Sequence, residues 1–591
     1  MALTAEQIAT QKKDVEELIA GSDVGFAKAL FYGKFKGDLL FPYPVLPAEE
    51  QRISDEATAR VRDFAHKHID HMQIDRDSRI PDSVIDGLAK IDVYKMTIPK
   101  EYGGLGFNQQ QYLKTMELLG GHCASTAVFV NAHHSIGCRA LCLFGTKEQQ
   151  AKWLPGLLDG SKLCAFALTE PEAGSDAGGV QTTATPDGDF YLLNGIKHYI
   201  TNGGIAHILT VMARTPDGKG GSKVTAFLVT PDMPGFEVLE ARAPKCGIRG
   251  TATGKMKFTN VRVPKENILG QIGRGLQAAL TVLNYGRVTF GATCTGHAKV
   301  CIKAMCEHAK TRKQFQQTLA EFELVKKKIA WAAAHCFAME AATTQCAAFI
   351  DKGSPDYMLE TAILKVFATE HLWPIVNDTI QIWGGKGYFS DQPLERWMRD
   401  ARINTIGEGA NDVLKAFIAV VGCKGPGEYL KGIQDNVLGL KLSWKTIKGA
   451  LGAGTTLALP WTVSTPVVPV KAAELQSDAE VLAKFVREFG LKLPKVFMAL
   501  KNEENFVQAQ MIHERLADIC IDIYVSACVL ARLDHMIANK MAKSSDPTAD
   551  VGAGKYFLKL AARRIRTSFA GLDDNDDGAL NSVADSILAK Y

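Results

Sequence analysis

The spacing of hydrophobic and polar positions changes several times along this chain of 591 residues. From about residue 47 to 163 it is helical. Between 164 and about 269, short β-rich runs such as 208–212 and 224–229 are separated by Gly, Pro and Asp clusters, which is typical of an antiparallel sheet. Long amphipathic patterns with few breakers return from 275 to 421 and predict a bundle of three to four helices.

The last quarter of the chain begins with a change of composition. Residues 425–471 are rich in Gly and Thr and predict a linker. Its segment 437–448 combines apolar residues, Trp444 and three lysines, so it would either lie at a membrane surface or pack against the protein. Helical periodicity resumes at 472. We therefore expect a mainly α protein with a central β domain, divided into an N-terminal arm 1–46, a helical domain 47–163, a middle β domain 164–272, a helical bundle 273–424, the linker 425–471 and a C-terminal helical domain 472–591.

Composition narrows the functional classes. Hydrophobic residues make up 46%, enough for a substantial core, and the net charge of +4 is too small to indicate a nucleic-acid partner. The first residues lack the basic and apolar regions of a secretory signal, and no stretch of about 18 apolar residues predicts a membrane span. These features favour a cytoplasmic protein of bacterial type, or a mature organellar one, peripheral to the inner membrane if segment 437–448 binds lipid.

Metal binding has little support in the sequence. The thirteen cysteines show no paired spacing, and we expect reduced, mostly buried thiols. Near the end of the chain, four residues match the first half of a calcium loop: Asp573, Asn575, Asp577 and Gly578. The twelfth position is Ala584 instead of the bidentate Glu, so an acidic solvated turn is favoured.

The most informative chemistry is a lone carboxylate between two glycines. Glu408 is flanked by Gly407 and Gly409 within 405–413. Glycine lets a flat substrate approach the backbone, and a carboxylate so placed can remove a proton next to a carbonyl. Taken alone, the pattern is more often a glutamate that begins a helix after a glycine turn. What lies upstream favours the chemical interpretation.

Three segments together resemble the acyl-CoA dehydrogenase family. They are Leu-Thr-Glu-Pro-Glu-Ala-Gly-Ser-Asp at 168–176, Lys-His-Tyr-Ile-Thr-Asn-Gly-Gly at 197–204, and Thr-Ile-Gly-Glu-Gly-Ala-Asn-Asp-Val at 405–413. The resemblance runs from about Pro42 to Cys423, and the long C-terminal extension is similar to the very-long-chain branch. It implies a helical domain, a small antiparallel β domain and a four-helix bundle, here followed by an extra C-terminal helical bundle.

The resemblance also implies the reaction. This is FAD-dependent α,β-dehydrogenation of a long-chain acyl-CoA, with electrons passed to an electron-transferring flavoprotein. Glu408 would take the α-proton and its backbone N–H would bind the enolate oxygen, while a hydride would leave the β-carbon for the flavin. Burial should raise the pKa of Glu408. The positions implied for substrate contact are Ser175, Asn284, Arg287, Gly407 and Gly409, with a structural ion pair as the alternative role of Arg287.

The flavin contacts that the resemblance implies fall into three groups. Phe166, Leu168 and Thr169 would line one side of the isoalloxazine and Tyr199, Ile200 and Thr201 the other, with Ser175 at the pyrophosphate or the CoA. A second group would reach a flavin held by the neighbouring subunit, which implies a homodimer or homotetramer: Arg312, Phe315, Gln381, Gly384 and Gly385. The third group is Ala410, Asn411 and Asp412. For the aromatic residues the alternative is core packing, and for Arg312 a surface charge.

Two positions depart from the family pattern. Gly407 stands where Tyr or Phe is usual, which removes a ring from the substrate wall, and Ala410 stands where Thr is usual, which removes a hydroxyl contact to the flavin adenosine. Two other functions therefore remain as alternatives. One is an acyl-CoA oxidase, which shares the fold and the base but reduces oxygen. The other is a non-catalytic assembly protein on the same fold.

Overall fold

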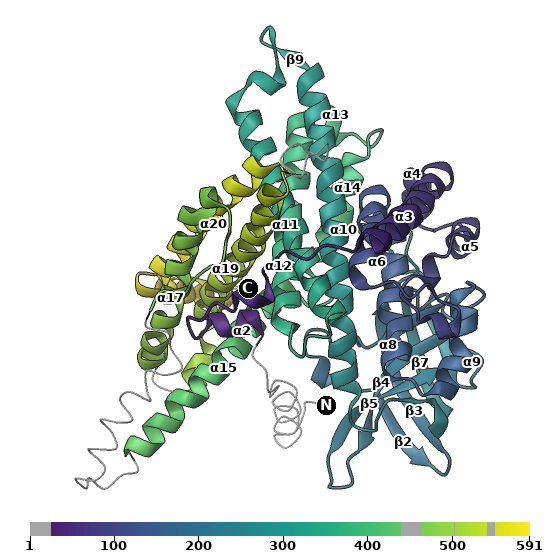
Figure 1. Ribbon diagram of the computed structural model, residues 1–591. Coiled ribbons are helices and arrows are strands. Elements are labelled where there is room, and N and C mark those ends of the chain that lie inside the picture. Colours follow the sequence, from purple (N-terminus) through teal and green to yellow (C-terminus); the bar gives the residue numbers. More distant parts are fainter. Residues whose placement is uncertain (1–24, 439–463, 501–502, 541–549) are drawn as a thin grey trace.

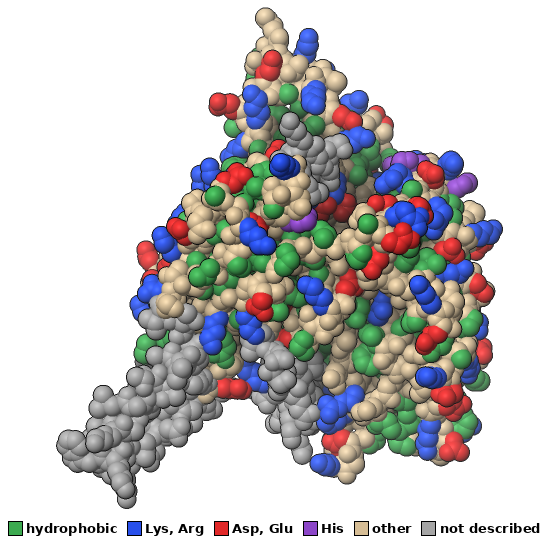
Figure 2. All heavy atoms as spheres, viewed as in Figure 1, with side chains coloured by type: hydrophobic (Ala, Val, Ile, Leu, Met, Phe, Trp, Pro, Cys, Tyr) green, Lys and Arg blue, Asp and Glu red, His purple; other side chains and the backbone are tan. Residues whose placement is uncertain are grey.

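The computed structural model (Figure 1) is mostly helical, with the strands gathered at the lower right of the view, and it describes residues 25–438, 464–500, 503–540 and 550–591. The predicted fold class is confirmed: a helical part, a β domain, a long helical bundle and a further helical region follow one another along the chain. No helix among these residues has the length and apolar character needed to cross a bilayer. Figure 2 shows acidic and basic side chains interspersed over the visible face.

The first part of the chain is a set of mostly short helices. Helix α6 begins with a capping box in which Asn108 accepts from the backbone N–H of Gln111 and the Gln111 side chain accepts from that of Asn108. A π-helical stretch, η4 (Asn131–Cys138), is buried along its whole length. The elements are α2 (Phe26–Leu30), α3 (Ala48–His68), α4 (His71–Asp77), α5 (Asp82–Lys90), α6 (Gln109–His122), α7 (Ala124–Val130), η4, α8 (Arg139–Phe144) and α9 (Lys147–Leu158).

The middle domain is one eight-stranded sheet in the order β6-β7-β3-β2-β4-β5-β8, with β1 also paired to β4. Most pairs are antiparallel, as predicted. However, β1 runs parallel to β4 with Phe166 opposite Thr210, so the sheet is mixed. The strands are β1 (Cys164–Ala167), β2 (Thr183–Asp187), β3 (Phe190–Ile200), β4 (Ile208–Pro216), β5 (Ser222–Val229), β6 (Phe236–Glu240), β7 (Gly254–Pro264) and β8 (Ile268–Leu269).

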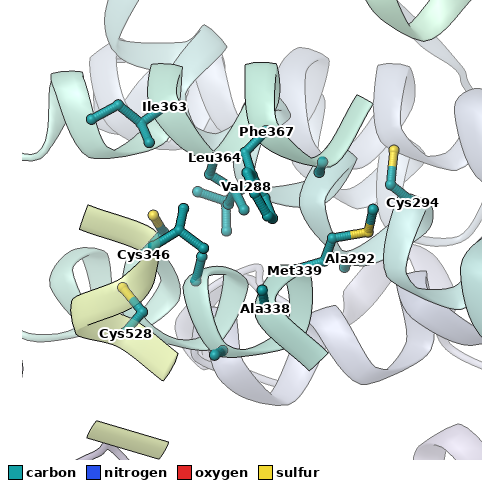
Figure 3. Packing of buried hydrophobic residues seen from close by; sticks show 14 of the residues in the cluster. Val288, Ala292, Cys294, Ala338, Met339, Cys346, Ile363, Leu364, Phe367 and Cys528 are labelled. Carbon is teal, nitrogen blue, oxygen red and sulfur yellow. The ribbon is translucent and has the colours of Figure 1, made fainter. Parts of the chain in front are cut away.

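Long helices form the next part and share one hydrophobic core with the C-terminal region. Figure 3 shows Val288, Met339 and Phe367 of three bundle helices turned toward one another, and Cys528 of the C-terminal region near Cys346. The bundle elements are α10 (Gly275–Thr311), the hairpin β9 (Lys313–Gln314) and β10 (Gln317–Thr318), α11 (Glu323–Asp351), α12 (Met358–Trp383), α13 (Gly385–Tyr388), α14 (Leu394–Arg402) and α15 (Asn411–Leu438).

The expected linker does not begin at residue 425, because α15 is helical to Leu438. Its glycines allow close packing instead of breaking the helix. A Cβ on Gly422 would lie 2.2 Å from the ring of Phe31, and one on Gly425 would lie 2.2 Å from the hydroxyl of Tyr32. These two residues directly follow α2, so the expected arm packs against α15. From residue 439 on, the segment considered for membrane contact lies outside the described residues.

The C-terminal region contains α17 (Gln476–Leu500), α18 (Glu503–Gln508), α19 (Gln510–Ala538), α20 (Val551–Asp573) and α21 (Asp577–Leu588). It is joined to the bundle by polar contacts as well as by the shared core. Arg532 pairs with Glu340 at 2.7 Å. At the calcium-like segment, Asp573 pairs with Lys492, and Asp577 accepts two hydrogen bonds from Arg515, so both carboxylates already have cationic partners.

Candidate active site

Glu408 lies in the turn between α14 and α15. Its φ is 55° and that of Gly409 is 97°. A left-handed backbone at a residue other than glycine is uncommon and is frequent at functional sites. The side chain reaches η4, where Asn131 Nδ2 donates to Glu408 Oε1 at 3.2 Å. On α10 it meets Gly286, where a Cβ would stand 2.5 Å from Oε2.

The environment of this carboxylate favours a base that titrates near neutrality. Oε2 is buried and has no hydrogen-bond partner among the described residues. Burial raises the pKa of Glu408 to about 7, against the lowering effects of Arg287, Lys365 and the Asn131 hydrogen bond. A general base works best when its pKa lies close to the working pH. The pKa increase expected from the sequence is therefore present, and burial is its cause.

Arg287 and Asn284 face the same site from α10. Arg287 Nη1 donates to Asn284 Oδ1 at 3.2 Å, and Thr361 Oγ1 donates to the same oxygen at 3.0 Å. Burial lowers the pKa of Arg287 to about 10, although Glu408 acts to raise it. Arg287 makes no ion pair within 4 Å in the part of the chain that the structure describes. It therefore acts on Glu408 through its electrostatic field and not through a direct ion pair.

Lys365 of α12 holds the turn that carries Glu408. Its Nζ donates to the carbonyl of Gly409 at 2.7 Å and to Asn411 Oδ1 at 2.8 Å, and its side chain is fully buried. Burial lowers the pKa of Lys365 to about 8. Asn411 also donates to Thr369 Oγ1 at 3.0 Å. The Asn411 amide, expected at the flavin, is thus engaged within the protein, whereas Asp412 is exposed and Ala410 half-buried.

The expected isoalloxazine contacts form an open face at one side of the sheet. Phe166, Leu168, Thr169 and Thr201 are half-buried, and Tyr199 is 64% exposed with a φ of 59°. Such a face can accept a flat aromatic group. Two expected contacts differ. The Ile200 side chain is buried in the sheet core, because the left-handed backbone of Tyr199 and the irregular pairing between Lys197 and Ile200 interrupt the alternation of β3. Ser175 is exposed on a loop.

A buried ion pair fixes the backbone of that face. Lys197 Nζ lies 2.6 Å from Glu170 Oε1 and donates to the carbonyl of Leu168 at 2.9 Å. Glu170 also accepts from the hydroxyl and the backbone N–H of Thr182. His198 N–H donates to the carbonyl of Thr169 at 2.9 Å. The end of β3 is thereby held against the segment that follows β1.

The residues expected at a neighbouring subunit's flavin lie away from Glu408. Arg312 and Phe315 belong to the β9–β10 hairpin, and Gln381, Gly384 and Gly385 lie where α12 ends and α13 begins, at the same end of the bundle (Figure 1). All five are exposed, Phe315 to 88%. Gln381 follows Lys365 by 16 positions, about 24 Å along a helix. They cannot join Glu408 around one compact ligand within this subunit.

Family profiles match nearly the whole chain. The acyl-CoA dehydrogenase N-terminal, middle and C-terminal domains match residues 49–161, 165–261 and 273–422, and the ACAD9/ACADV C-terminal domain matches 473–591. The mouse very long-chain specific acyl-CoA dehydrogenase, a mitochondrial protein, is 33% identical over 96% of this chain and 87% of its own. The chain belongs to the acyl-CoA dehydrogenase family.

Other members of this family agree with that assignment. The probable acyl-CoA dehydrogenase FadE10 of Mycobacterium tuberculosis is 36% identical over 95% of this chain and 88% of its own. An acyl-CoA dehydrogenase from Bacillus anthracis, solved in complex with FAD, is 25% identical with a TM-score of 0.76 and covers 94% of both chains. The butyryl-CoA dehydrogenase of Megasphaera elsdenii (33% identical, TM-score 0.60) covers 63% of this chain and 97% of its own.

Three residues of the site were not identified from the sequence: Asn131, Gly286 and Lys365. Lys365 had a detectable signal, because it is a single lysine inside the apolar run 362–367, and a lysine is almost never fully buried without a partner. Gly286 lies between Asn284 and Arg287, two residues that the sequence did identify. Nothing in the local sequence separates Asn131 from other polar residues of a helical stretch.

A second cluster of polar and sulfur atoms lies behind the sheet. His133, Cys138 and Cys164 are all buried, and the two sulfurs are 3.6 Å apart. The imidazole is already engaged by the protein, since Cys164 N–H donates to Nδ1 at 3.3 Å and Nε2 lies 3.1 Å from the carbonyl of Leu157. His133 therefore packs as a hydrogen-bonded core residue.

The raised pKa of Glu408 has a consequence for stability. An acid whose pKa is about 7 when folded and 4.5 when unfolded destabilises the native state as pH rises from 4.5 to 7, and the loss is complete above 7. Between pH 5 and pH 8 the wild type should therefore lose about 2 kcal/mol more than Glu408→Gln. Thermal unfolding of both proteins across this range measures it. Parallel pH dependences would contradict a raised pKa.

Proposed function

We propose that this protein catalyses FAD-dependent α,β-dehydrogenation of a long-chain acyl-CoA to the trans-2-enoyl-CoA. The observation that carries the proposal is the Glu408 carboxylate. It is held in a left-handed turn, its pKa is about 7, and Arg287 and Lys365 both favour its charged form. Removal of a weakly acidic proton next to a thioester carbonyl requires one base with these properties.

Each residue of the site has a role in that chemistry. Glu408 takes the proton from the α-carbon, and Asn131 orients the carboxylate from η4. The backbone N–H of Glu408 makes no hydrogen bond to another described residue and is available to the developing enolate oxygen. Lys365 fixes the turn through the Gly409 carbonyl. Arg287 and Lys365 stabilise the carboxylate before it accepts the proton.

The open face of the sheet would hold the FAD isoalloxazine. Phe166, Leu168 and Thr169 would lie on one side of the ring system, and Tyr199 and Thr201 on the other. The backbone of Ile200, the exposed Ser175 and the polar Asp412 remain as further contacts. Bound FAD would accept the hydride released from the β-carbon. The fit rests on half-buried side chains with a solvent-exposed aromatic ring beside them.

The exposed residues at the far end of the bundle bear on the oligomeric state. Arg312, Phe315, Gln381, Gly384 and Gly385 are exposed together, far from Glu408, which supports a homo-oligomer in which each subunit completes its neighbour's flavin site. The long-chain preference is supported by the C-terminal region, residues 473–591, which matches the ACAD9/ACADV C-terminal domain. The mouse very long-chain specific acyl-CoA dehydrogenase aligns with 96% of this chain. We further propose that an electron-transferring flavoprotein receives the electrons.

The test is anaerobic titration of the purified holoprotein with palmitoyl-CoA, followed by the flavin absorbance. Bleaching is expected at one equivalent of substrate per flavin. Retained flavin without bleaching would contradict the long-chain substrate, and protein without flavin would favour the assembly function. Rapid consumption of oxygen during aerobic turnover would favour the oxidase over transfer to a flavoprotein.

The missing ring at Gly407 provides a test of substrate shape. A Cβ at Gly407 would meet nothing closer than the Ile403 carbonyl at 3.7 Å, so the fold can accept a side chain there. Gly407→Tyr should narrow the space beside the base. We expect kcat/KM for an α-methyl-branched acyl-CoA to fall about tenfold relative to the straight chain. Gly407→Ala is the matched control, and an unchanged ratio in the Tyr variant would contradict a wall at this position.

A further inference from the structure

A chain of polar contacts connects the Glu408 turn to the C-terminal helical region. It begins with Lys365, which binds the Gly409 carbonyl and Asn411 Oδ1. Asn411 is the first residue of α15, and its Nδ2 lies 3.5 Å from Glu370 Oε1 of α12. Each of these groups comes from the bundle that carries the base.

Lys415 extends the chain to a different part of the protein. It lies one helical turn after Asn411, and its Nζ is 3.4 Å from Glu370. On the other side it is 3.4 Å from Glu514 Oε1 and 3.1 Å from Asp518 Oδ1, both on α19. The Lys415 side chain is only 12% exposed. One ammonium therefore joins α12, α15 and α19 at the point where α15 begins.

The charges at this contact are complementary. The nearby carboxylates raise the pKa of Lys415, although burial acts to lower it. Burial raises the pKa of Asp518 to about 6, against the lowering effect of Lys415. Removing Lys415 would leave three carboxylates close together, and like charges without a counterion repel. The first turn of α15 would then lose its polar attachment to α19.

We propose that Lys415 and Asp518 are positioning residues for Glu408, so that the C-terminal region holds the base in its reactive geometry. The physical reason is the conformation of the turn. Glu408 and Gly409 both have positive φ, and such a backbone persists only where its surroundings hold it. Lys365 holds the turn from one side, and α15 fixes it from the other. The role in catalysis rests on the proposed function of Glu408.

The experiment uses the full-length holoenzyme, four single variants and the double variant Lys415→Met/Asp518→Asn. Lys415→Met removes the charge, Lys415→Arg keeps it, and Asp518→Asn removes one partner. Lys555→Met is the matched control, because Lys555 pairs with Glu474 at 2.7 Å within the C-terminal region. Hydrogen–deuterium exchange of the peptide 406–418 reports the turn without reference to activity. Flavin reduction by saturating palmitoyl-CoA reports its effect on the base.

We expect Lys415→Met to increase exchange in this peptide about tenfold and to lower the reduction rate about tenfold, with substrate affinity within twofold of wild type. Asp518→Asn should have a smaller effect that is not additive with Lys415→Met. Lys415→Arg should restore both readouts, and Lys555→Met should match wild type. Unchanged exchange in Lys415→Met, or an equal change in Lys555→Met, would overturn the proposal. Failure of wild type to bleach would refute the proposed function alone, since exchange still tests the attachment.

Discussion

Glu408→Gln is expected to slow flavin reduction by palmitoyl-CoA by about three orders of magnitude while leaving bound flavin in place. Glutamine has nearly the same size and can still contact Asn131, but it cannot accept the α-proton. The measurement is anaerobic stopped-flow of the flavin absorbance. Loss of the base should lower the rate at saturating substrate, because the proton is transferred only in the reacting complex.

A second buried glutamate provides the control for this variant. Burial also raises the pKa of Glu360 to about 7, and its carboxylate accepts from the Ala27 N–H at 2.8 Å. Glu360→Gln should therefore reduce flavin at the wild-type rate. Equal slowing in both variants would mean that loss of a buried carboxylate disturbs the fold, and an active Glu408→Gln would exclude Glu408 as the base.

Gly286→Ala is expected to produce a more stable but much slower enzyme. A Cβ at this position would lie 2.5 Å from Glu408 Oε2, so the carboxylate must move away from α10. Displacement of a catalytic group by about 1 Å can cost about a hundredfold in rate. The glycine lies inside a helix, where alanine is favoured by up to about 1 kcal/mol. The rate of flavin reduction should therefore fall, whereas the thermal unfolding temperature should rise.

Gly578→Ala separates the local clash from the general effect of alanine in a helix. Gly578 lies in the first turn of α21 and has no atom within 4 Å of an added Cβ. Its rate of flavin reduction should equal that of wild type. A wild-type rate in Gly286→Ala would show that the carboxylate moves without cost and that α10 does not set its position.

The residues identified from the sequence were those that belong to local patterns. Glu408 stands out because glycines flank it, and Arg287 follows Asn284 at a spacing that puts both on one helix face. Both residues lie at the site in the structure. The isoalloxazine contacts were assigned by motif position, without regard to which side of a strand each residue occupies. Ile200 therefore proved to be a core residue, whereas its neighbours Tyr199 and Thr201 are accessible.

Residues that contact Glu408 or its turn from distant parts of the chain could not be identified from local sequence patterns. Asn131 is 277 positions away in the chain, and Lys365 bonds to a carbonyl 44 positions later. Gly286 matters because a carboxylate approaches it, which only the packing of the turn against α10 decides. For the same reason the composition of 425–471 predicted a linker, whereas α15 continues to Leu438 and packs at Gly422 and Gly425 against Phe31 and Tyr32.

The sequence by itself determined the order of helices and strands, the family and the candidate base, because periodicity and short motifs are encoded by neighbouring residues. Tertiary structure alone decided the state of that base. The pKa of Glu408 depends on burial and on two cations from α10 and α12, and its unusual backbone depends on Lys365. These are distances in space between residues far apart in the chain, so no local pattern contains them.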